Sequence, residues 1–223
     1  MTLAFSLPSL AAAADFSACI KALSEDAELK MNKKALEKFF SHFKTYGSSI
    51  SNKRYGVLID YKRPSTQKRS YLIDIKNCDV VSWEYVIHGG QSKETKAGDP
   101  DSDGDLDKCT HSNGSRTNMT RPGPFVTDGC HETAKKGWKT LWKEGKRNCQ
   151  GIRLNGFLAG VNDPNVAAGV VMHEHIAVKN DGKIKPVGQG CPTYAPDRLK
   201  AKLRYKLQQG TLIYIFAPQC GNH

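Results

Sequence analysis

A chain of 223 residues with 39% hydrophobic and 25% charged side chains has the length and composition of one soluble globular domain, with or without insertions. No apolar run approaches the roughly 20 residues that a membrane-spanning helix needs, so the sequence predicts no integral membrane segment. The formal net charge of +11 predicts attraction to polyanions such as bacterial walls, nucleic acid or anionic membranes, or else a solvated basic surface. We expect no nucleic-acid partner, because no helix-turn-helix, zinc-finger or RNA-binding signature accompanies the charge.

Residues 1–14 indicate an export signal. Residues 3–14 are mostly apolar and small, and the alanines at their end resemble a signal cleavage site. No Lys or Arg precedes the apolar run, so an ordinary flexible tail is the alternative. With such a signal, the mature protein is expected to be secreted, periplasmic or associated with the cell wall.

Seven cysteines fit an exported protein. Six can pair into three disulfides, and the seventh then keeps its thiol. Cys130 and Cys149 flank a self-contained polar segment, so we predict that these two pair. Parity alone does not identify the cysteine that stays outside the disulfides.

The first predicted element of the mature chain is a helix over residues 32–43, with Asn32 as its N-cap. The apolar side chains on its buried face are Leu36, Phe39, Phe40 and Phe43. We place His42 on the opposite, solvent-facing side. Residues 15–50 are therefore expected to form a helical region that packs on the core.

Residues 51–223 indicate a mostly β fold of the α+β class with peripheral helices. Apolar runs bounded by turn signals predict strands at 55–61, 69–75, 78–87, 152–154, 170–173 and 211–216, with a short one within 121–127. Turns connect the first three, which favours mixed or antiparallel pairing. The spacing of Leu199, Leu203 and Leu207 predicts a basic amphipathic helix over 196–209. An insertion at 128–150 is expected to be a short helix or a hairpin, in which Trp138 and Trp142 pack on the domain or act as a lid or glycan contact.

An acidic loop lies at residues 99–107. Its carboxylates stand at alternate positions around a glycine, and Ca²⁺ takes several oxygen ligands from such a tight loop. Thr110 stands where an EF-hand has its bidentate glutamate, so the loop is not an EF-hand. A solvated acidic loop and a structural Ca²⁺ site both remain open. The ligands of that site would be Asp99, Asp101, Asp103 and Asp105.

The stretch with the clearest chemistry is 187–192, in which small or conformationally restricted residues surround Cys191. Residues 170–173 are typical of a buried strand that delivers His173 at its end, 18 residues before the cysteine. A thiol becomes a strong nucleophile as the thiolate, and an imidazole within hydrogen-bond reach favours that form near neutral pH. We predict a catalytic pair of Cys191 and His173; the alternative is a disulfide cysteine beside a structural histidine.

Five ordered blocks of sequence match the pattern of one family. The blocks are 60–69, 86–89, 112–115 with 123–127, 152–163, and 170–173 with 190–192. On these residues the chain resembles the murein L,D-transpeptidase catalytic-domain-like proteins, secreted bacterial enzymes that act on peptidoglycan stem peptides. The resemblance covers about 32–217 and implies a single mostly β domain, a β-sandwich or barrel braced by disulfides, that requires no cofactor.

The resemblance also implies roles for individual residues. Cys191 would be acylated, His173 would be its base, and the backbone carbonyl of Glu174 would orient the imidazole. The backbone amides of Gly190 and Cys191 would face the developing oxyanion. Several side chains would bind the substrate, with Arg153 able to pair with a carboxylate. The substrate-binding set is His88, Asn113, Ser115, Arg153 and Gln189.

Three positions depart from the family pattern. Gly188 stands where the family usually has Ser or Thr, and Gln189 where it commonly has an aromatic residue or His. Glu174 stands where it has a small residue. These departures bear on the outcome and rate of the reaction and leave the Cys–His pair intact.

Three functions follow, in decreasing order of support. The first is a cysteine acyltransferase on peptidoglycan stem peptides: an L,D-transpeptidase, or an L,D-carboxypeptidase or endopeptidase if water resolves the thioester. The second is a non-catalytic murein-binding module. The third is a metalloenzyme that uses His88, His173, His175 and Cys191, although no recognised metal-ligand spacing supports it. We expect the protein to be a monomer.

Overall fold

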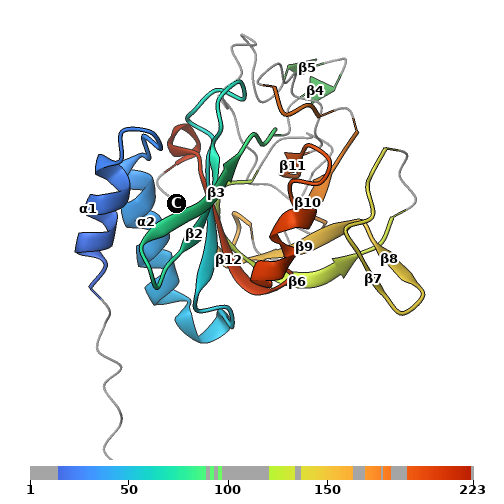
Figure 1. The fold of residues 1–223 in the computed structure, drawn as a ribbon, viewed down its shortest axis with the longest axis horizontal. Coiled ribbons are helices and arrows are strands. Elements are labelled where there is room, and N and C mark those ends of the chain that lie inside the picture. The colour runs from blue at the N-terminus through green and yellow to red at the C-terminus, as the bar shows by residue number, and fades with distance from the viewer. Residues whose placement is uncertain are drawn as a thin grey trace, which may run out of the picture.

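The computed structural model describes residues 15–88, 91–92, 95–96, 121–133, 137–162, 169–176, 178–181 and 190–221. Helices come first in the chain and strands dominate the remainder (Figure 1). The helices are α1 (Ser17–Glu25) and α2 (Lys33–Thr45), with the 3₁₀ helices η1 (Gly47–Ser49), η2 (Lys200–Tyr205) and η3 (Pro218–Cys220). The strands are β1 (Tyr55–Asp60), β2 (Ser70–Asp74), β3 (Asp79–Glu84), β4 (Gln91–Ser92), β5 (Thr95–Lys96), β6 (Gly123–His131), β7 (Trp142–Glu144), β8 (Arg147–Cys149), β9 (Gly151–Gly156), β10 (Val171–Glu174), β11 (Thr193–Tyr194) and β12 (Gln209–Phe216). No helix among these residues is long and apolar enough to cross a membrane.

One eight-stranded sheet organises the fold, in the order β11-β10-β9-β6-β12-β1-β2-β3. Most neighbouring strands are antiparallel, but β1 pairs with β12 in parallel, and so does β10 with β11. Strand β12, the last in the chain, lies in the middle of the sheet between β6 and β1. The predicted mostly β, α+β fold with mixed pairing is confirmed.

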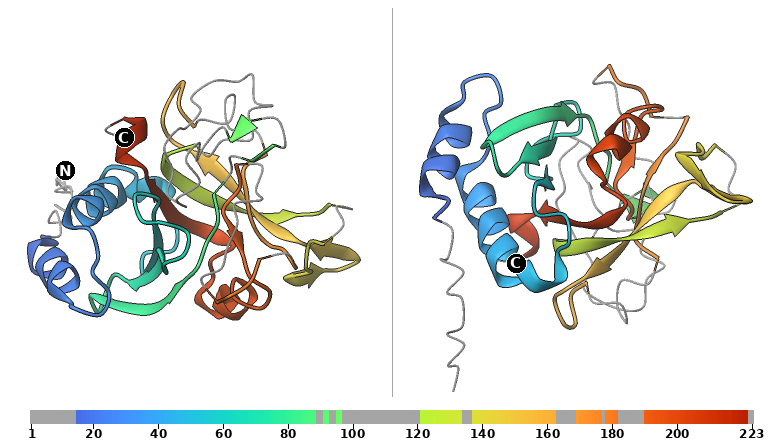
Figure 2. Two further views of the ribbon diagram at one scale, coloured as in Figure 1. Left: turned by 90° about the horizontal axis from the view of Figure 1, so that it is seen from above. Right: turned by 60° about the horizontal axis from the view of Figure 1, so that its bottom comes forward.

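The central strands β1 and β12 are buried on both faces, which is why their sequences are nearly continuous apolar runs. Side chains alternate between the faces, so Val57 and Ile59 join one hydrophobic cluster and Leu58 joins the other. The first cluster draws on every strand from β11 round to β2, and the second is covered by α1 and α2. Figure 2 shows both helices against this side of the sheet, with the β7–β8 hairpin projecting at the opposite end of the molecule.

Helix α2 begins where the sequence predicts. The Asn32 side chain accepts hydrogen bonds from the backbone N–H groups of Lys34 and Ala35, as an N-cap does. Its buried face carries Leu36, Phe39 and Phe40, and each such side chain stabilises the fold by roughly 1.5–3 kcal/mol.

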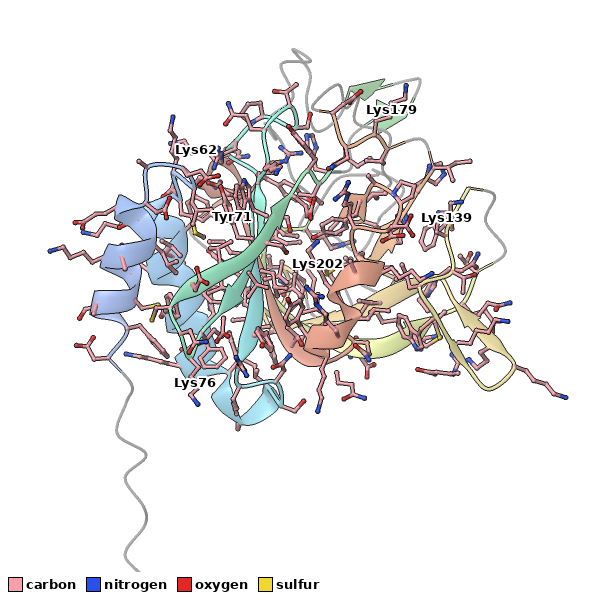
Figure 3. All side chains as sticks on the ribbon, in the orientation of Figure 1. Lys62, Tyr71, Lys76, Lys139, Lys179 and Lys202 are labelled. Atoms are coloured by element: carbon pink, nitrogen blue, oxygen red, sulfur yellow. A yellow bond between two sulfur atoms is a disulfide. The ribbon has the colours of Figure 1, made fainter. Side chains whose placement is uncertain are left out.

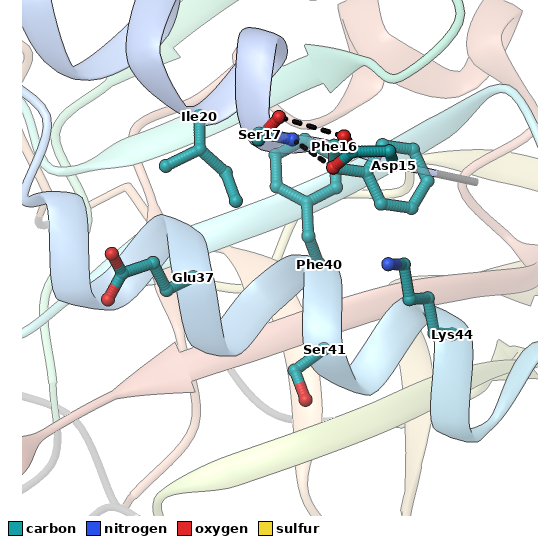
Figure 4. Close-up of a pocket in the computed structure, with 8 residues that line it drawn as sticks. All are labelled: Asp15, Phe16, Ser17, Ile20, Glu37, Phe40, Ser41 and Lys44. Carbon is teal, nitrogen blue, oxygen red and sulfur yellow. Dashed lines mark hydrogen bonds between the residues drawn. The ribbon is translucent and has the colours of Figure 1, made fainter. Parts of the chain in front are cut away.

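Helix α1 packs against α2 through aromatic rings. The ring of Phe16 stacks on Phe40 with centroids 4.5 Å apart and meets Phe43 edge-on at 6.0 Å. Phe16 and Phe40 border a pocket of about 250 Å³ (Figure 4). A disulfide between Cys19 and Cys78 fastens α1 to the turn before β3.

Exposed lysines lie at several separate places on the described part of the chain. Four of the lysines in Figure 3 are exposed at separate places on the periphery: Lys62, Lys76, Lys139 and Lys179. Lys202 is different, because it is buried with its Nζ 3.2 Å from a carboxylate oxygen of Glu84 and donates to the carbonyl of Arg198. This ion pair fastens η2 to β3, while the exposed lysines favour a solvated basic surface.

The predicted helix over residues 196–209 is wrong in kind. Leu199 and Leu207 are buried as their spacing indicates, but they lie on the turns on either side of the short 3₁₀ helix η2. Lys206 ends η2 with a φ of +58°, in the left-handed region. A spacing of four identifies the buried side of a segment and does not distinguish an α-helix from tighter turns.

The predicted insertion contains a hairpin. Strand β6 runs to His131, well past the short strand expected within 121–127, and the β7–β8 hairpin follows. Gly129 has a φ of +69° where the pairing with β9 shifts register, a bulge that bends β6 outward. The predicted disulfide between Cys130 and Cys149 is confirmed and closes the base of the hairpin.

His42 does not lie on the solvent side of α2 as predicted. It follows Phe39 by three residues and so borders the buried face. Its ring lies 4.9 Å from that of Tyr214 on β12, and its Nε2 is buried with no hydrogen-bond partner among the described residues. Burial, and more weakly the charge of Lys38, lowers the pKa of His42 to about 4.

This pKa predicts a loss of stability in mild acid. Between pH 6.5 and 4 the unfolded chain binds a proton at His42 that the folded chain does not, so stability falls as the pH falls. We expect the unfolding free energy of the wild type, relative to that of His42→Gln, to drop by about 1–2 kcal/mol between pH 6.5 and 4. The full pKa shift would imply a larger drop, but solvent screening of the partly exposed imidazole reduces it. Urea denaturation of both proteins at pH 7, 5.5 and 4 measures the difference. A pH-independent difference would contradict the assignment.

Candidate active site

Two neighbouring strands bring the segments of His173 and Cys191 together (Figure 1). His173 lies on β10, and β11 begins two residues after Cys191. The strands pair in parallel with His173 opposite Thr193, and the His173 N–H donates to the carbonyl of Pro192 at 3.2 Å. The pairing of these two strands thus brings together the segments of the predicted base and nucleophile, which are 18 residues apart in the sequence.

Cys191 carries a thiol and is partly exposed. Its Sγ lies 3.8 Å from the carbonyl oxygen of Gly169, and Gly190 before it has a φ of +92° that favours glycine. The prediction that Cys191 stays outside the disulfides is confirmed. The cysteines in disulfides among the described residues are Cys19, Cys78, Cys130, Cys149 and Cys220.

Thr193 decides which imidazole nitrogen carries the proton. Its Oγ1 lies 3.0 Å from Nε2 of His173 and 3.0 Å from the carbonyl oxygen of Cys191. A carbonyl only accepts, so the single hydroxyl proton goes to Cys191 and the oxygen must accept from the imidazole. The neutral His173 ring therefore carries its proton on Nε2 and leaves the lone pair of Nδ1 as its basic site.

An indole ring covers His173. Trp138 stacks on the imidazole with ring centroids 3.5 Å apart and planes 6° from parallel. Only 6% of the His173 surface is exposed. The sequence interpretation of Trp138 as aromatic packing, a lid or a glycan contact did not include this contact with the predicted base.

The side chain of Glu174 has a structural role that its sequence position next to His173 does not predict. Its carboxylate is buried and accepts hydrogen bonds from the backbone N–H groups of Asp197, Leu199 and Lys200, at 2.9, 2.6 and 2.8 Å. The carboxylate thereby caps the segment that enters η2. The Glu174 carbonyl accepts from the N–H of Lys139 at 3.3 Å. Its predicted role in orienting His173 stays a prediction.

A buried polar group backs the site. The Tyr61 hydroxyl donates to the carbonyl of Ile87 at 3.2 Å, and Ile87 exchanges backbone hydrogen bonds with Thr193. The guanidinium of Arg69 lies 4.8 Å over the Tyr61 ring, and the ring of His88 meets that ring edge-on at 5.6 Å. Burial raises the pKa of Tyr61 and outweighs the lowering effect of the Arg69 charge, so the phenol stays neutral.

The structure separates the predicted substrate-binding residues. His88 is fully buried, whereas Arg153 is exposed on β9, next to β10 and opposite Val171. Neither position tests their predicted role. Asn113, Ser115 and Gln189 lie outside the described residues, and so do the possible calcium ligands Asp99, Asp101, Asp103 and Asp105.

The metalloenzyme hypothesis lacks a ligand cluster. Within the described part of the chain, the one group of potential ligands that gathers within 4.8 Å is Cys130, Glu144 and Cys149, and its two sulfurs form a disulfide. His88, His173, His175 and Cys191 form no such group.

Sequence reasoning missed Thr193 and the contact of Trp138 with His173. The signal for Thr193 was available, because this hydroxyl stands only two residues after the predicted nucleophile. The signal for Trp138 was not, because nothing local links the insertion to β10.

Comparison with known proteins agrees with the resemblance seen in the sequence. Residues 27–216 match a family model described as "L,D-transpeptidase catalytic domain". No curated protein sequence matches the chain. Among solved structures, the chain is similar to an L,D-transpeptidase from Mycobacterium smegmatis, at 14% identity and a TM-score of 0.37. That match covers 74% of this chain and 59% of the other, so the chain spans less than two thirds of that protein.

Proposed function

Because this chain belongs to the L,D-transpeptidase catalytic domain family, whose model spans 27–216, we propose that it is a peptidoglycan-modifying cysteine acyltransferase with Cys191 as nucleophile and His173 as base. The observation that carries the proposal is the β10–β11 ladder. The ladder pairs His173 with Thr193, two residues after the Cys191 thiol, and Oγ1 of Thr193 lies 3.0 Å from Nε2 of the imidazole, which supports this proposal.

The proposed first half-reaction forms a thioester. Nδ1 of His173 takes the thiol proton, and the thiolate attacks the amide carbonyl between meso-diaminopimelate and D-alanine of a tetrapeptide stem. Backbone N–H groups of Gly190 and Cys191 stabilise the oxyanion. The imidazolium then protonates the departing amine, so D-alanine leaves and the stem remains as a thioester on Cys191.

The acceptor decides the product. An amine of a second stem attacks the thioester, His173 takes its proton, and a 3–3 cross-link forms as the thiol is restored. Water in the same position gives a tripeptide, and hydrolysis of existing 3–3 links uses the same steps. Arg153 is the proposed partner of a stem carboxylate, since it is exposed on the strand beside β10.

The disulfides also support export. Disulfides persist in oxidising compartments, and peptidoglycan lies outside the cytoplasm. We therefore propose a secreted, periplasmic or wall-associated protein.

Product analysis tests the function. Purified protein is incubated with tetrapeptide muropeptides and, separately, with 3–3 dimers, and the products are identified by mass spectrometry beside a Cys191→Ala control. Loss of D-alanine with new dimers indicates transpeptidation, loss to a tripeptide indicates a carboxypeptidase, and cleavage of the dimers alone indicates an endopeptidase. Bound but unchanged murein would overturn the enzyme proposal in favour of a binding module.

Thr193 gives a sharper prediction. Thr193→Val cannot accept from Nε2, so we expect kcat to fall by about 10- to 100-fold because the tautomer and ring orientation are no longer fixed. Thr193→Ser keeps the hydroxyl and should retain most of the activity. The rate of D-alanine release measures both.

A second threonine provides the control. Thr211 is also buried, but its hydroxyl donates to the carbonyl of Lys206, so Thr211→Val should change kcat by less than about twofold. Wild-type turnover in Thr193→Val would show that Thr193 has no part in positioning His173.

A further inference from the structure

The stacking of Trp138 on His173 affects the charge of the imidazole as well as its packing. The centroid distance of 3.5 Å and the angle of 6° put the indole face directly against the imidazole face. The proposed reaction places a positive charge on this imidazole each time the thiol is deprotonated. The face of an indole attracts cations, so the contact strengthens when the ring is charged.

Trp138 is held in place from both sides. The N–H of Ile176 donates to the carbonyl of Gly137, and the N–H of Lys139 donates to that of Glu174, so the segment around Trp138 pairs with the end of β10. Gly137 has a φ of +91°, and a Cβ there would lie 2.5 Å from the imidazole of His175. Only glycine lets the chain pass this closely to β10.

The segment that carries Trp138 runs into the β7–β8 hairpin, which is braced at its base. Leu141 is buried in the core, and its N–H donates to the carbonyl of Cys149 at 2.8 Å. The disulfide of Cys149 with Cys130 fastens β8 to β6. The indole is therefore presented by a rigid support.

We propose that Trp138 is a positioning residue for His173. It blocks rotation of the imidazole from one face while Thr193 holds its Nε2 edge, and its ring stabilises the imidazolium that accompanies the Cys191 thiolate. This inference rests on the proposed function. It extends the pair of Cys191 and His173 to a set of four that includes a residue from the insertion.

Other charged and titratable groups lie near the pair. His131 on β6 lies 5.8 Å from the Trp138 ring. The groups on the neighbouring elements are His131, Arg153, Glu174, His175, Cys191 and Lys139. A His131→Gln background separates the titration of that imidazole from that of His173.

The test measures thiolate reactivity and turnover in Trp138→Leu and Trp138→Phe. Trp142→Phe is the matched control, because Trp142 lies four residues further along, at the start of β7, where its indole N–H donates to Glu144. The rate of Cys191 alkylation by iodoacetamide is measured from pH 5 to 9, along with kcat and KM for D-alanine release.

For Trp138→Leu we expect alkylation at pH 6.5 to slow by about tenfold, with the acid limb of the profile moved to higher pH. We expect kcat to fall by a similar factor and KM to change by less than about twofold. Trp138→Phe should recover part of the loss, and Trp142→Phe should match the wild type. An unchanged alkylation profile in Trp138→Leu, or a rise in KM alone, would overturn the inference. Failure of the proposed function is distinct, because the wild type itself would then release no D-alanine.

Discussion

Replacing Cys191 by alanine is expected to lower turnover by about 10³-fold or more, since no other group in the proposed site can form the thioester. The variant should fold normally. Cys191 takes part in no disulfide and is partly exposed, so its replacement removes little buried surface. Steady-state release of D-alanine measures the loss.

The control for this prediction is Cys191→Ser. A hydroxyl is a far weaker nucleophile beside one imidazole, so this variant should be nearly as inactive while keeping the shape of the site. The thermal midpoints of both variants should lie within about 2 °C of the wild type. Turnover within about tenfold of the wild type in either variant would contradict the assignment of the nucleophile.

The largest expected loss of stability follows Glu174→Ala. The change removes the acceptor of three backbone N–H groups, that of Leu199, which is buried, and those of Asp197 and Lys200, which are partly buried. Each such donor costs about 1–3 kcal/mol, and partial entry of water reduces the sum, so we expect a loss of about 3–5 kcal/mol. For a chain of this size that lowers the thermal midpoint by roughly 6–15 °C, measured by circular dichroism.

Glu132 is the matched control. Its carboxylate is half exposed and lies 3.9 Å from Arg147, so Glu132→Ala should change stability by less than about 1 kcal/mol. Glu174→Gln keeps one acceptor oxygen and should lie between the two. A thermal midpoint for Glu174→Ala equal to that of the control would show that the carboxylate does not hold the segment before η2.

Much of the fold could be predicted because strong local patterns coincide with the core. The apolar runs of β1 and β12 are buried on both faces, and Asn32 caps α2 as its sequence position indicates. The disulfide of Cys130 with Cys149 followed from the short segment between them. These features depend on neighbours along the chain, which a sequence displays.

The missed features depend on contacts between distant segments. Glu174 accepts a hydrogen bond from a turn 23 residues away, just before the 3₁₀ segment that stands where the leucine spacing suggests an α-helix. Trp138 reaches His173 across an insertion, and the ring of His42 packs against a tyrosine of the last strand. Of the candidate site, the sequence predicts the cysteine and the histidine, whereas their supports come from the three-dimensional structure.

The most direct test of Cys191 as the acylated residue is to trap the intermediate. The protein is mixed with a tetrapeptide donor, quenched in acid within the first turnover, and digested for peptide mapping by mass spectrometry. We predict a tripeptide adduct on the peptide that contains Cys191, absent from Cys191→Ala and prolonged when acceptor is withheld. Release of D-alanine without an adduct, or with an adduct on another residue, would contradict Cys191 as the nucleophile.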